Sequence, residues 1–428
     1  MIVPDASQRA VLVVGSHGRF ELPHVRGRPG AAGVIEALRH VYSLDAPYLR
    51  AAQILRDEAG QPVAGLHELD APPPGWEPTP GTAWLELEST DPTTLAPSQF
   101  ISAVERWWAE QRGAPVPERR PPWARPGWLA EASSWICDTC VANGFAPSGP
   151  VELVAQWPLS SVLRLETEGG RVYMKAVFSI FGHEPTVTEV LSAQHPTLVP
   201  EVVAVDAPLG WMLMHELHGT ELGDADVSRW GDGLRAAASI HRAWVGRTTE
   251  LFTLGAHDRT LETLADDMRT AFESIELPAE ARARLERVAP ELERLCEELA
   301  TCAVPETLIH GDLHPWNVMV EGDELRIFDW SDACVAHPMF DLPTFLTRTE
   351  DESARVSMCE AYFAEWGELA SLRELQSAFA LARPLGHLHQ AVSYVRINDA
   401  LEPDDRWIFA GAPEEWLEGA IGLVEAMR

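Results

Sequence analysis

The sequence predicts an α+β protein in which a separate small α/β domain precedes a small β-rich lobe and a large helical lobe. Three observations support this fold class. Strand-like runs alternate with turns in residues 1–90, three more fill much of residues 151–178, and the chain after Gly219 is mostly helical. A length of 428 residues allows two or three domains.

The N-terminal domain is expected to cover residues 1–90. The run AVLVVGSHGRFELP predicts a β-hairpin around residues 15–18, and VIEALRHVY predicts a helix after it. This region faintly resembles the loop-helix region of Nudix hydrolases. Those enzymes need a cluster of glutamates on the helix, whereas this stretch has only Glu36. The resemblance therefore implies a degenerate domain with a structural or regulatory role.

Residues 91–150 are expected to form a helical linker region. PSQFISAVERWWAEQRG predicts one helix, the prolines of residues 115–128 block regular structure, and a second helix is expected at residues 129–143. The second helix carries Cys137 and Cys140, but no second pair or nearby histidine completes a zinc site. We expect free thiols there.

The β-rich lobe is expected at residues 151–218 and the helical lobe at residues 219–428. The sequence TEGG at residues 167–170 predicts a turn between two strands, and a helix is expected at residues 184–194. The helical lobe is interrupted by the segment HGDLHPWNVMVEGDELRIFDWSD, residues 310–332.

The net charge of −32, from 33 basic and 65 acidic residues, argues against a nucleic-acid partner and an anionic membrane surface. An acidic surface would suit a cationic small-molecule substrate. No window has the length of an uninterrupted apolar membrane span, and the first residues do not form a secretory signal. We therefore expect a cytoplasmic protein, whose oligomeric state the sequence leaves open.

Residues 310–332 carry the groups that phosphoryl transfer requires. The reaction needs a carboxylate near the acceptor hydroxyl and oxygen ligands for magnesium, and Asp312, Asn317 and Asp329 supply them. Two apolar runs flank a turn-like stretch and predict a hairpin centred near Asp323. Asn317 and Asp329 are equidistant from this centre, so we expect them to face each other and share one metal ion.

The motifs HGDLHPWN and IFDWSD resemble those of the aminoglycoside phosphotransferase and choline kinase-like family of small-molecule kinases. The resemblance implies a protein-kinase-like bilobal fold and ATP as co-substrate. It also implies that Asp312 is the catalytic base, that Asn317 and Asp329 bind magnesium, and that Asp341 has a structural role. Gly311 and the DWS sequence replace residues typical of protein kinases, and no activation segment follows.

The nucleotide site implied by the resemblance includes a strand lysine and an acidic partner on the next helix. Lys175, in RVYMKAV, is the only lysine of the β-rich lobe. Glu184 at the start of the following helix is the preferred partner, with Glu189 as the alternative. The segment GWMLMHELHGTEL resembles the hinge between lobes. The sequence lacks GxGxxG, and the serines of WPLSSVLRL stand in its place. The remaining expected ATP-binding residues are Ser160, Ser161, Met214, His215, Glu216 and Leu217.

The acceptor pocket of the resembled family is built by the helical lobe and its C-terminal helices. Candidates here are His387, His389, Tyr394, Asp399, Asp404 and Asp405. The sequence thus predicts an ATP- and magnesium-dependent phosphotransferase acting on a hydroxyl of an aminoglycoside, amino alcohol or sugar-like acceptor. The alternative is a nucleotide-binding regulator without turnover, which the missing glycine loop favours.

Overall fold

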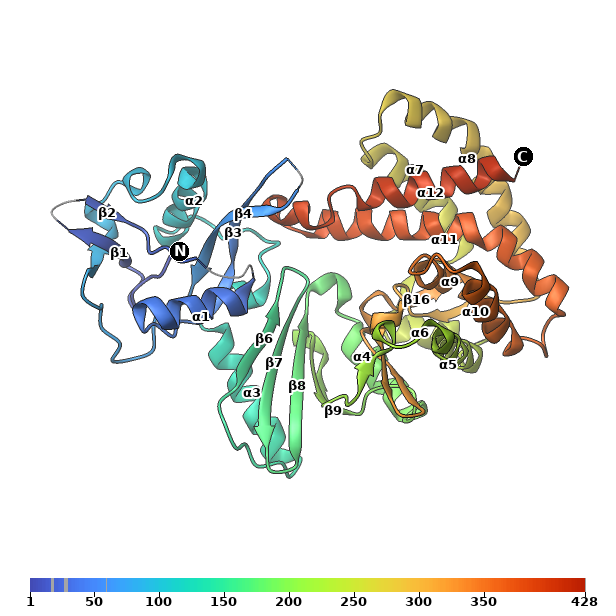
Figure 1. The fold of residues 1–428 in the computed structure, drawn as a ribbon, viewed down its shortest axis with the longest axis horizontal. Helices are drawn as coiled ribbons and strands as arrows, with labels where there is room; N and C mark the ends of the chain where they lie inside the picture. Colours follow the sequence, from blue (N-terminus) through green and yellow to red (C-terminus); the bar gives the residue numbers. More distant parts are fainter. Residues whose placement is uncertain (17–18, 27–29, 59, 428) are drawn as a thin grey trace. The chain divides into compact units, whose positions relative to one another are not determined.

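The computed structural model describes residues 1–16, 19–26, 30–58 and 60–427 of the chain (Figure 1). The chain divides into two compact units. One comprises Met1–Phe178 together with Leu401–Trp407, and the other comprises Ser179–Ala400 together with Ile408–Arg428. The predicted domain boundaries at residues 90, 150 and 218 stay predictions.

Over its described residues, the N-terminal unit contains two small sheets, three α-helices and a three-stranded antiparallel group. Its elements are β1 (Ala10–Ser16), β2 (Arg19–Glu21), α1 (Ala31–Tyr42), β3 (Tyr48–Arg56), β4 (Pro62–Leu69), β5 (Thr82–Glu86), α2 (Ile101–Gln111), α3 (Trp128–Ala142), β6 (Glu152–Gln156), β7 (Ser160–Thr167) and β8 (Gly170–Val177).

The predicted hairpin at the N-terminus is formed by β1 and β2, which pair from Val14↔Glu21 to Ser16↔Arg19, and β1 also pairs with β5. Residues 17 and 18 of the predicted turn lie outside the described residues. Strands β3 and β4 form a second antiparallel pair. Apolar side chains from the β1 sheet and from α2, including Trp107 and Trp108, share one core cluster, and α1 contributes to another.

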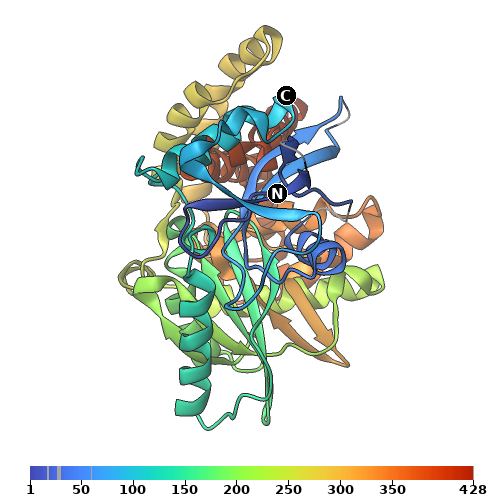
Figure 2. The ribbon, with the colours of Figure 1, turned by 90° about the vertical axis from the view of Figure 1, so that its left-hand side faces the viewer.

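Strands β6, β7 and β8 are antiparallel neighbours, and both ribbon views show α3 alongside them (Figures 1 and 2). Thr167 pairs with Gly170, so the predicted turn at TEGG is confirmed. In β7 and β8 buried and less buried residues alternate, the pattern of strands with one covered face. Cys137 and Cys140 lie on α3 and are both free thiols.

A buried ion cluster holds the segment Leu401–Trp407 in the N-terminal unit. The Arg120 guanidinium is 4% exposed and donates to Glu402 Oε1 at 2.5 Å and to Glu110 Oε1 at 2.9 Å. The Arg56 guanidinium lies 3.9 Å from the ring centre of Trp407, a cation–π contact. Charges that are buried this deeply need partners, which explains why a segment from the far end of the sequence belongs here.

The C-terminal unit is mainly helical, with short strands around the catalytic segment. Its elements are α4 (Glu184–Gln194), β9 (Val202–Asp206), β10 (Trp211–His215), β11 (Thr220–Glu221), α5 (Trp230–Ala243), α6 (Thr248–Thr253), β12 (His257–Asp258), α7 (Leu261–Ser274), α8 (Ala279–Ala300), β13 (Thr307–Ile309), β14 (Val318–Glu321), β15 (Glu324–Ile327), β16 (Cys334–Ala336), α9 (Asp341–Leu346), α10 (Glu352–Ala364), α11 (Leu372–Ala400) and α12 (Ala412–Ala426).

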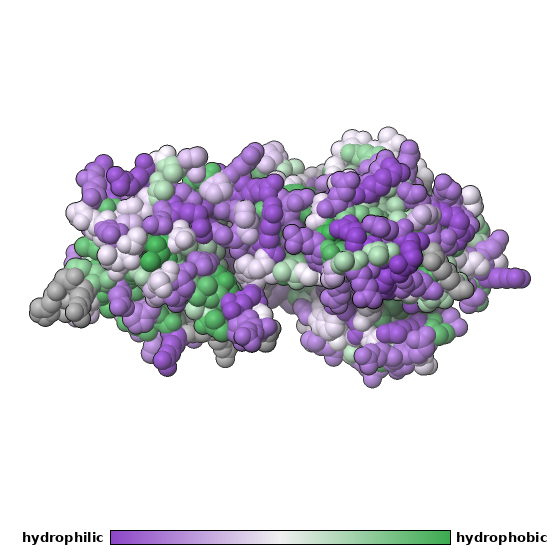
Figure 3. Space-filling view, turned by 90° about the horizontal axis from the view of Figure 1, so that it is seen from above, coloured by the Kyte–Doolittle hydropathy of each residue, from purple (hydrophilic) through white to green (hydrophobic). Residues whose placement is uncertain are grey.

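One large apolar core joins these helices with the short sheets β11-β14-β15 and β12-β16-β13. Trp244, Trp330 and Trp366 are fully buried in it, and α11 and α12 run side by side (Figure 1). Charged and polar side chains cover most of the face seen in Figure 3. None of the described helices is long and apolar enough to cross a membrane.

Candidate functional site

The catalytic loop begins where β13 ends at Ile309 and leads through a 3-10 turn, Pro315–Asn317, into β14. Gly311 has φ 86°, a left-handed conformation that favours glycine. A Cβ atom at this position would lie 2.1 Å from the Asp332 carbonyl oxygen. The loop therefore passes so close to residues 329–332 that only glycine fits, which accounts for Gly311 in the HGD motif.

Asp341, the first residue of α9, holds this loop in place through hydrogen bonds to its backbone. Its fully buried carboxylate accepts hydrogen bonds from the backbone N–H groups of His310 and Gly311, both at 2.8 Å, and His241 Nε2 lies 3.2 Å away. Burial alone would raise the pKa of Asp341, but the hydrogen bonds from His241 and the loop hold that pKa below its usual value. Asp341 is therefore ionised and fixes the position of the two residues before Asp312.

Asp312 and Asn317 are held together by the backbone of the loop. Asn317 Nδ2 donates to the Asp312 carbonyl oxygen at 3.0 Å, which orients the amide and turns Oδ1 away from this bond. The Asp312 side chain is 36% exposed, and His314 Nε2 lies 3.8 Å from its Oδ2. Partial burial lowers the pKa of His314, although the charge of Asp312 opposes this effect. Asp312 thus presents an accessible carboxylate beside a largely neutral imidazole.

The hairpin after Asn317 exists, but the predicted register is wrong by one residue. Val318 pairs with Ile327 and Glu321 with Glu324, so the turn is centred between Gly322 and Asp323. The Phe328 backbone N–H donates to the Asn317 carbonyl oxygen at 3.0 Å, which places Phe328 opposite Asn317. The two-residue turn uses the left-handed φ of 62° at Gly322. Asn317 and the residue after Phe328 still lie at the same open end of the hairpin.

Asp329 has a left-handed backbone, with φ 64° and ψ 61°, and its side chain is exposed. Such a conformation is uncommon for a residue other than glycine and is concentrated at functional sites. Asp329 follows β15 by two residues, and its charge acts on His314 of the catalytic loop and on Asp332.

Ser331 connects Asp329 to the start of α4. Its hydroxyl oxygen lies 2.7 Å from Asp329 Oδ1 and 2.8 Å from Glu184 Oε2. Glu184 is buried whereas Glu189 is exposed, so Glu184 is the acid of α4 that faces the catalytic segment. Ser331 was not among the predicted site residues, and its place two residues after Asp329 is the one signal that could have indicated it. One hydroxyl proton cannot serve both carboxylates at once, so the two acids share this serine.

Asp332 is a second residue that the sequence interpretation missed. It is partly buried, and burial together with the charges of Asp312 and Asp329 raises its pKa to about 8, against the opposing charge of Arg259. Arg259 is 7% exposed, and its Nη1 has no hydrogen-bond partner among the described residues. Both side chains line a small cavity of about 40 Å³. The catalytic segment thus contains one more carboxyl group than the predicted base and metal ligands, and this group is largely protonated at pH 7.

The donor set fits magnesium better than a metal held by the protein alone. Among the described residues no group of three or more histidine, cysteine, aspartate or glutamate side chains could hold a metal ion. Asn317 and Asp329 supply one amide oxygen and one carboxylate, and Mg²⁺ at kinase sites takes one or two such ligands plus nucleotide phosphates. The two residues therefore fit the predicted magnesium site.

The predicted ATP-binding residues are distributed over both units. Lys175 lies on β8 of the N-terminal unit, where it pairs with Val162 of β7. Ser160 and Ser161 begin β7. The Ser160 hydroxyl accepts a hydrogen bond from Trp157 at 2.6 Å, and the fully buried Ser161 hydroxyl donates to Gln156 at 3.2 Å. Both hydroxyls have partners within the chain, so the proposed phosphate contacts from these serines stay predictions.

The predicted hinge segment lies in the C-terminal unit. Met214 and His215 end β10, and Glu216 and Leu217 follow it. The His215 backbone N–H is already bonded to the Glu201 carbonyl oxygen at 3.1 Å. The adenine contacts of these four residues remain predictions.

The candidate acceptor residues lie in different environments. Tyr394 lies near the catalytic loop, because burial and the charges of Asp312 and Asp332 raise its pKa to about 12. Asp404 lies in the N-terminal unit, where it pairs with Arg106 at 2.5 Å. The other candidates take several environments: His387 and Asp399 lie on α11, His389 is buried against Phe340, and Asp405 belongs to the ion cluster of the N-terminal unit.

Residues 183–375, somewhat less than half of the chain, match a family described as "Phosphotransferase enzyme family". This segment is similar to the proteins of that phosphotransferase family. The match confirms the resemblance predicted from the HGD and DWSD motifs and the assignment to the phosphotransferase class of enzymes. No curated protein sequence matches the chain.

Solved structures of small-molecule phosphotransferases resemble the chain in fold. Choline kinase LicA from Streptococcus pneumoniae has a TM-score of 0.50 and 14% identity, over 69% of this chain and 99% of that one. A macrolide 2'-phosphotransferase type I has a TM-score of 0.47 and 17% identity, over 69% and 97%. The first likeness supports the fold alone. The predicted kinase-like α+β fold is thereby confirmed, and the separate N-terminal domain stays a prediction.

Proposed function

We propose that this phosphotransferase moves the γ-phosphoryl group of ATP, with magnesium, to a hydroxyl group of a small molecule. The observation that carries the proposal is the arrangement around the catalytic loop. An accessible Asp312 carboxylate lies beside the open end of the hairpin that bears Asn317 and Asp329, in a loop that Asp341 fixes through two backbone hydrogen bonds.

Each residue has one task in the proposed reaction. Asp312 accepts the proton of the acceptor hydroxyl as the hydroxyl oxygen bonds to the γ-phosphorus and the bond to ADP breaks. Asn317 Oδ1 and the Asp329 carboxylate hold magnesium, which when bound neutralises charge on the phosphates. Glu184 orients Lys175 toward the phosphates, and the segment of Met214 to Leu217 contacts the adenine.

The acceptor we propose is an aminoglycoside, an amino alcohol or a sugar-like molecule. A cationic acceptor is favoured by the net charge of −32 and by the acids that gather near Asp312. Small cationic molecules would be drawn to such a region and then oriented by the helical part of the unit. Steering of this kind weakens as salt is added.

The alternative function is nucleotide binding without turnover. It is favoured by the β6–β7 turn, residues 157–159, which contains no glycine and so differs from the loops that cover phosphates in protein kinases. The Ser161 hydroxyl also favours this alternative, because it already donates to Gln156 rather than to a phosphate.

Magnesium-dependent release of ADP, measured across a panel of aminoglycosides, amino alcohols and sugars, separates the two functions. We expect turnover with at least one acceptor, and a loss of about 10²–10⁴-fold in kcat for Asp312→Asn with nucleotide binding retained. Asp323→Asn, an exposed acid at the tip of the same hairpin, is the matched control and should be unaffected. Tight binding of Mg·ATP without turnover on the whole panel would support the alternative.

A further inference from the structure

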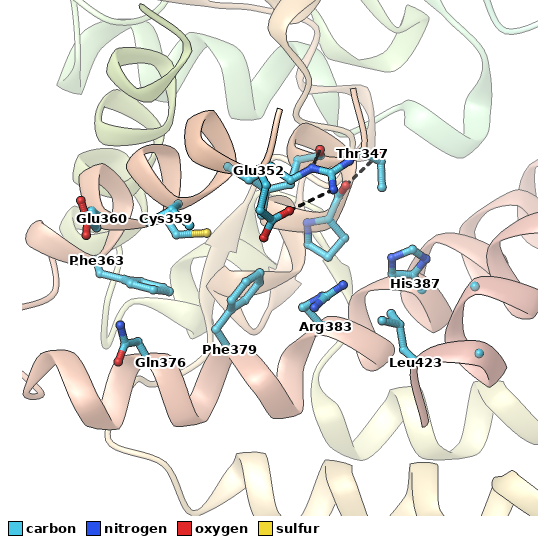
Figure 4. A pocket seen from close by; sticks show the side chains of 16 residues that line it. Thr347, Glu352, Cys359, Glu360, Phe363, Gln376, Phe379, Arg383, His387 and Leu423 are labelled. Carbon is cyan, nitrogen blue, oxygen red and sulfur yellow. Dashed lines mark hydrogen bonds and ion pairs between the residues drawn. The ribbon is translucent and has the colours of Figure 1, made fainter. Parts of the chain in front are cut away.

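A groove of about 570 Å³ lies between α9, α10, α11 and α12 of the C-terminal unit (Figure 4). Its volume is in the range of ~300–1,000 Å³ that is typical of small-molecule sites. The residues that line it do not include Asp312, Asn317 or Asp329. Its apolar walls are formed by Leu346, Val356, Phe363, Phe379 and Leu423.

Arg383 is a charged residue of this groove. Figure 4 shows its side chain entering the groove between Phe379 and His387. Among the described residues its guanidinium makes no hydrogen bond or ion pair. The Arg383 side chain is exposed, so its guanidinium is solvated in the absence of a ligand. A guanidinium next to apolar walls is suited to an anionic ligand.

The other charged residues of the groove do not satisfy Arg383. Arg355 donates to the carbonyl oxygen of Leu346, and the Glu352 carboxylate lies 3.4 Å from Arg355. Glu360 is exposed at the end of the groove away from Arg383 (Figure 4). Among the described residues that line the groove, Arg355 is therefore paired with a carboxylate and Arg383 is not.

His387 adds a neutral polar atom beside that charge. Burial and the nearby Arg383 lower the pKa of His387 to about 4, so the imidazole is neutral at pH 7. The ring packs against α12, where a Cβ atom at Gly419 would lie 2.6 Å from Nδ1. A neutral imidazole does not compete with Arg383 for an anion and offers a further hydrogen bond.

We propose that this groove binds a small organic anion with an apolar body. The carboxylate or sulfonate group pairs with Arg383, and the body lies between Phe363, Phe379 and Leu423. The inference goes beyond the proposed reaction and does not depend on it, because no reacting group lines the groove. Helix α11, which forms one wall of the groove, nevertheless contacts the catalytic loop. Gln390, one turn after His387 on α11, donates to the Gly311 carbonyl oxygen.

Binding can be measured on the full chain with 8-anilinonaphthalene-1-sulfonate, an aromatic anion whose fluorescence rises in apolar sites. Competition then compares 2-naphthoate with 2-naphthalenemethanol, which has the same ring system without the charge. We expect naphthoate to bind about tenfold more tightly than the alcohol, the value of one charge-assisted pair. Arg383→Gln should remove this difference. Arg373→Gln, an exposed arginine of α11 outside the groove, should leave it intact.

A second variant blocks the volume instead of the charge. A Cβ atom built at Gly422 meets nothing within 4 Å, so Gly422→Leu can place its side chain in the groove without straining α12. We expect Gly422→Leu to abolish binding of the sulfonate, and Gly422→Ala to retain it. The proposal is overturned if naphthoate and the alcohol bind equally well, if neither Arg383→Gln nor Gly422→Leu weakens binding, or if Mg·ATP displaces the sulfonate.

Discussion

Replacement of Asp341 by asparagine tests how the catalytic loop is held. The carboxylate is fully buried, accepts two backbone N–H groups at 2.8 Å and lies 3.2 Å from His241 Nε2. Asparagine has nearly the same shape, but its NH₂ group must face one of these donors. One charge-assisted hydrogen bond, worth about 1.5–3 kcal/mol, is lost, and the other becomes an ordinary bond worth about 1 kcal/mol. We therefore expect the C-terminal unit to lose about 2–5 kcal/mol.

Urea unfolding followed by tryptophan fluorescence measures this loss, since the fully buried Trp244, Trp330 and Trp366 report on the unit. The matched control is Asp351→Asn. Asp351 is exposed and accepts the Ala354 backbone N–H at the start of α10, and asparagine caps helices about as well as aspartate. A change within about 0.5 kcal/mol is expected for this control. If Asp341→Asn changes the free energy of unfolding as little as the control does, the carboxylate does not hold the loop.

The pH dependence gives a second test of the same residue. The pKa of Asp341 is lower in the folded protein than in the unfolded chain, so its contribution is present above the unfolded value of about 3.9 and is lost as the pH falls through the folded value. The difference in unfolding free energy between wild type and Asp341→Asn should therefore be constant from pH 5 to pH 8. A difference that fades within that range would show that another group is responsible.

Three further outcomes are expected. Lys175 is the only lysine of the sequence, so an ATP analogue with a lysine-reactive acyl phosphate should modify Lys175. Excess ATP should prevent this modification. A modification that ATP does not prevent would contradict the assignment of Lys175 to the nucleotide site. Burial and Glu402 raise the pKa of Asp405 to about 7, so the free energy of unfolding should fall as the pH rises from the unfolded pKa of about 4 to about 7. Thermal melts of Asp405→Asn should depend less on pH over that range. Gly311→Ala should lower kcat by about 10²-fold, because its Cβ would displace the loop, whereas Gly322→Ala at the open hairpin turn should not.

The catalytic segment could be predicted from the sequence because its parts are close together in the chain. Asp312, Asn317 and Asp329 lie within one loop and one hairpin, and the alternation of apolar runs with a turn predicts that hairpin. The register could not be predicted to the residue. Symmetry about Asp323 and a two-residue turn at Gly322 and Asp323 explain the sequence equally well, and the backbone conformation of Gly322 decides between them.

Contacts between distant parts of the chain were beyond sequence interpretation. Ser331 meets Glu184 across 147 positions, and Arg120 meets Glu402 across 282. Neither periodicity nor turn residues say which of 65 acids a given donor will meet. The resemblance implied a structural aspartate at Asp341, but not that its oxygens bind the backbone immediately before the catalytic residue.

The charge around the catalytic loop explains why the proposed reaction needs a divalent cation. Asp329 and Glu184 both contact the Ser331 hydroxyl, and Asp312 lies in the neighbouring loop. Burial, together with the charges of these acids, raises the pKa of Asp332 to about 8 and keeps it largely protonated at pH 7. Arg259 is the cation that opposes them there. A nucleotide brings several more negative charges, and bringing like charges together in a partly buried site is costly. Asn317 and Asp329 would hold magnesium, whose charge would offset that cost, so the same acids that would repel ATP alone would favour the Mg·ATP complex.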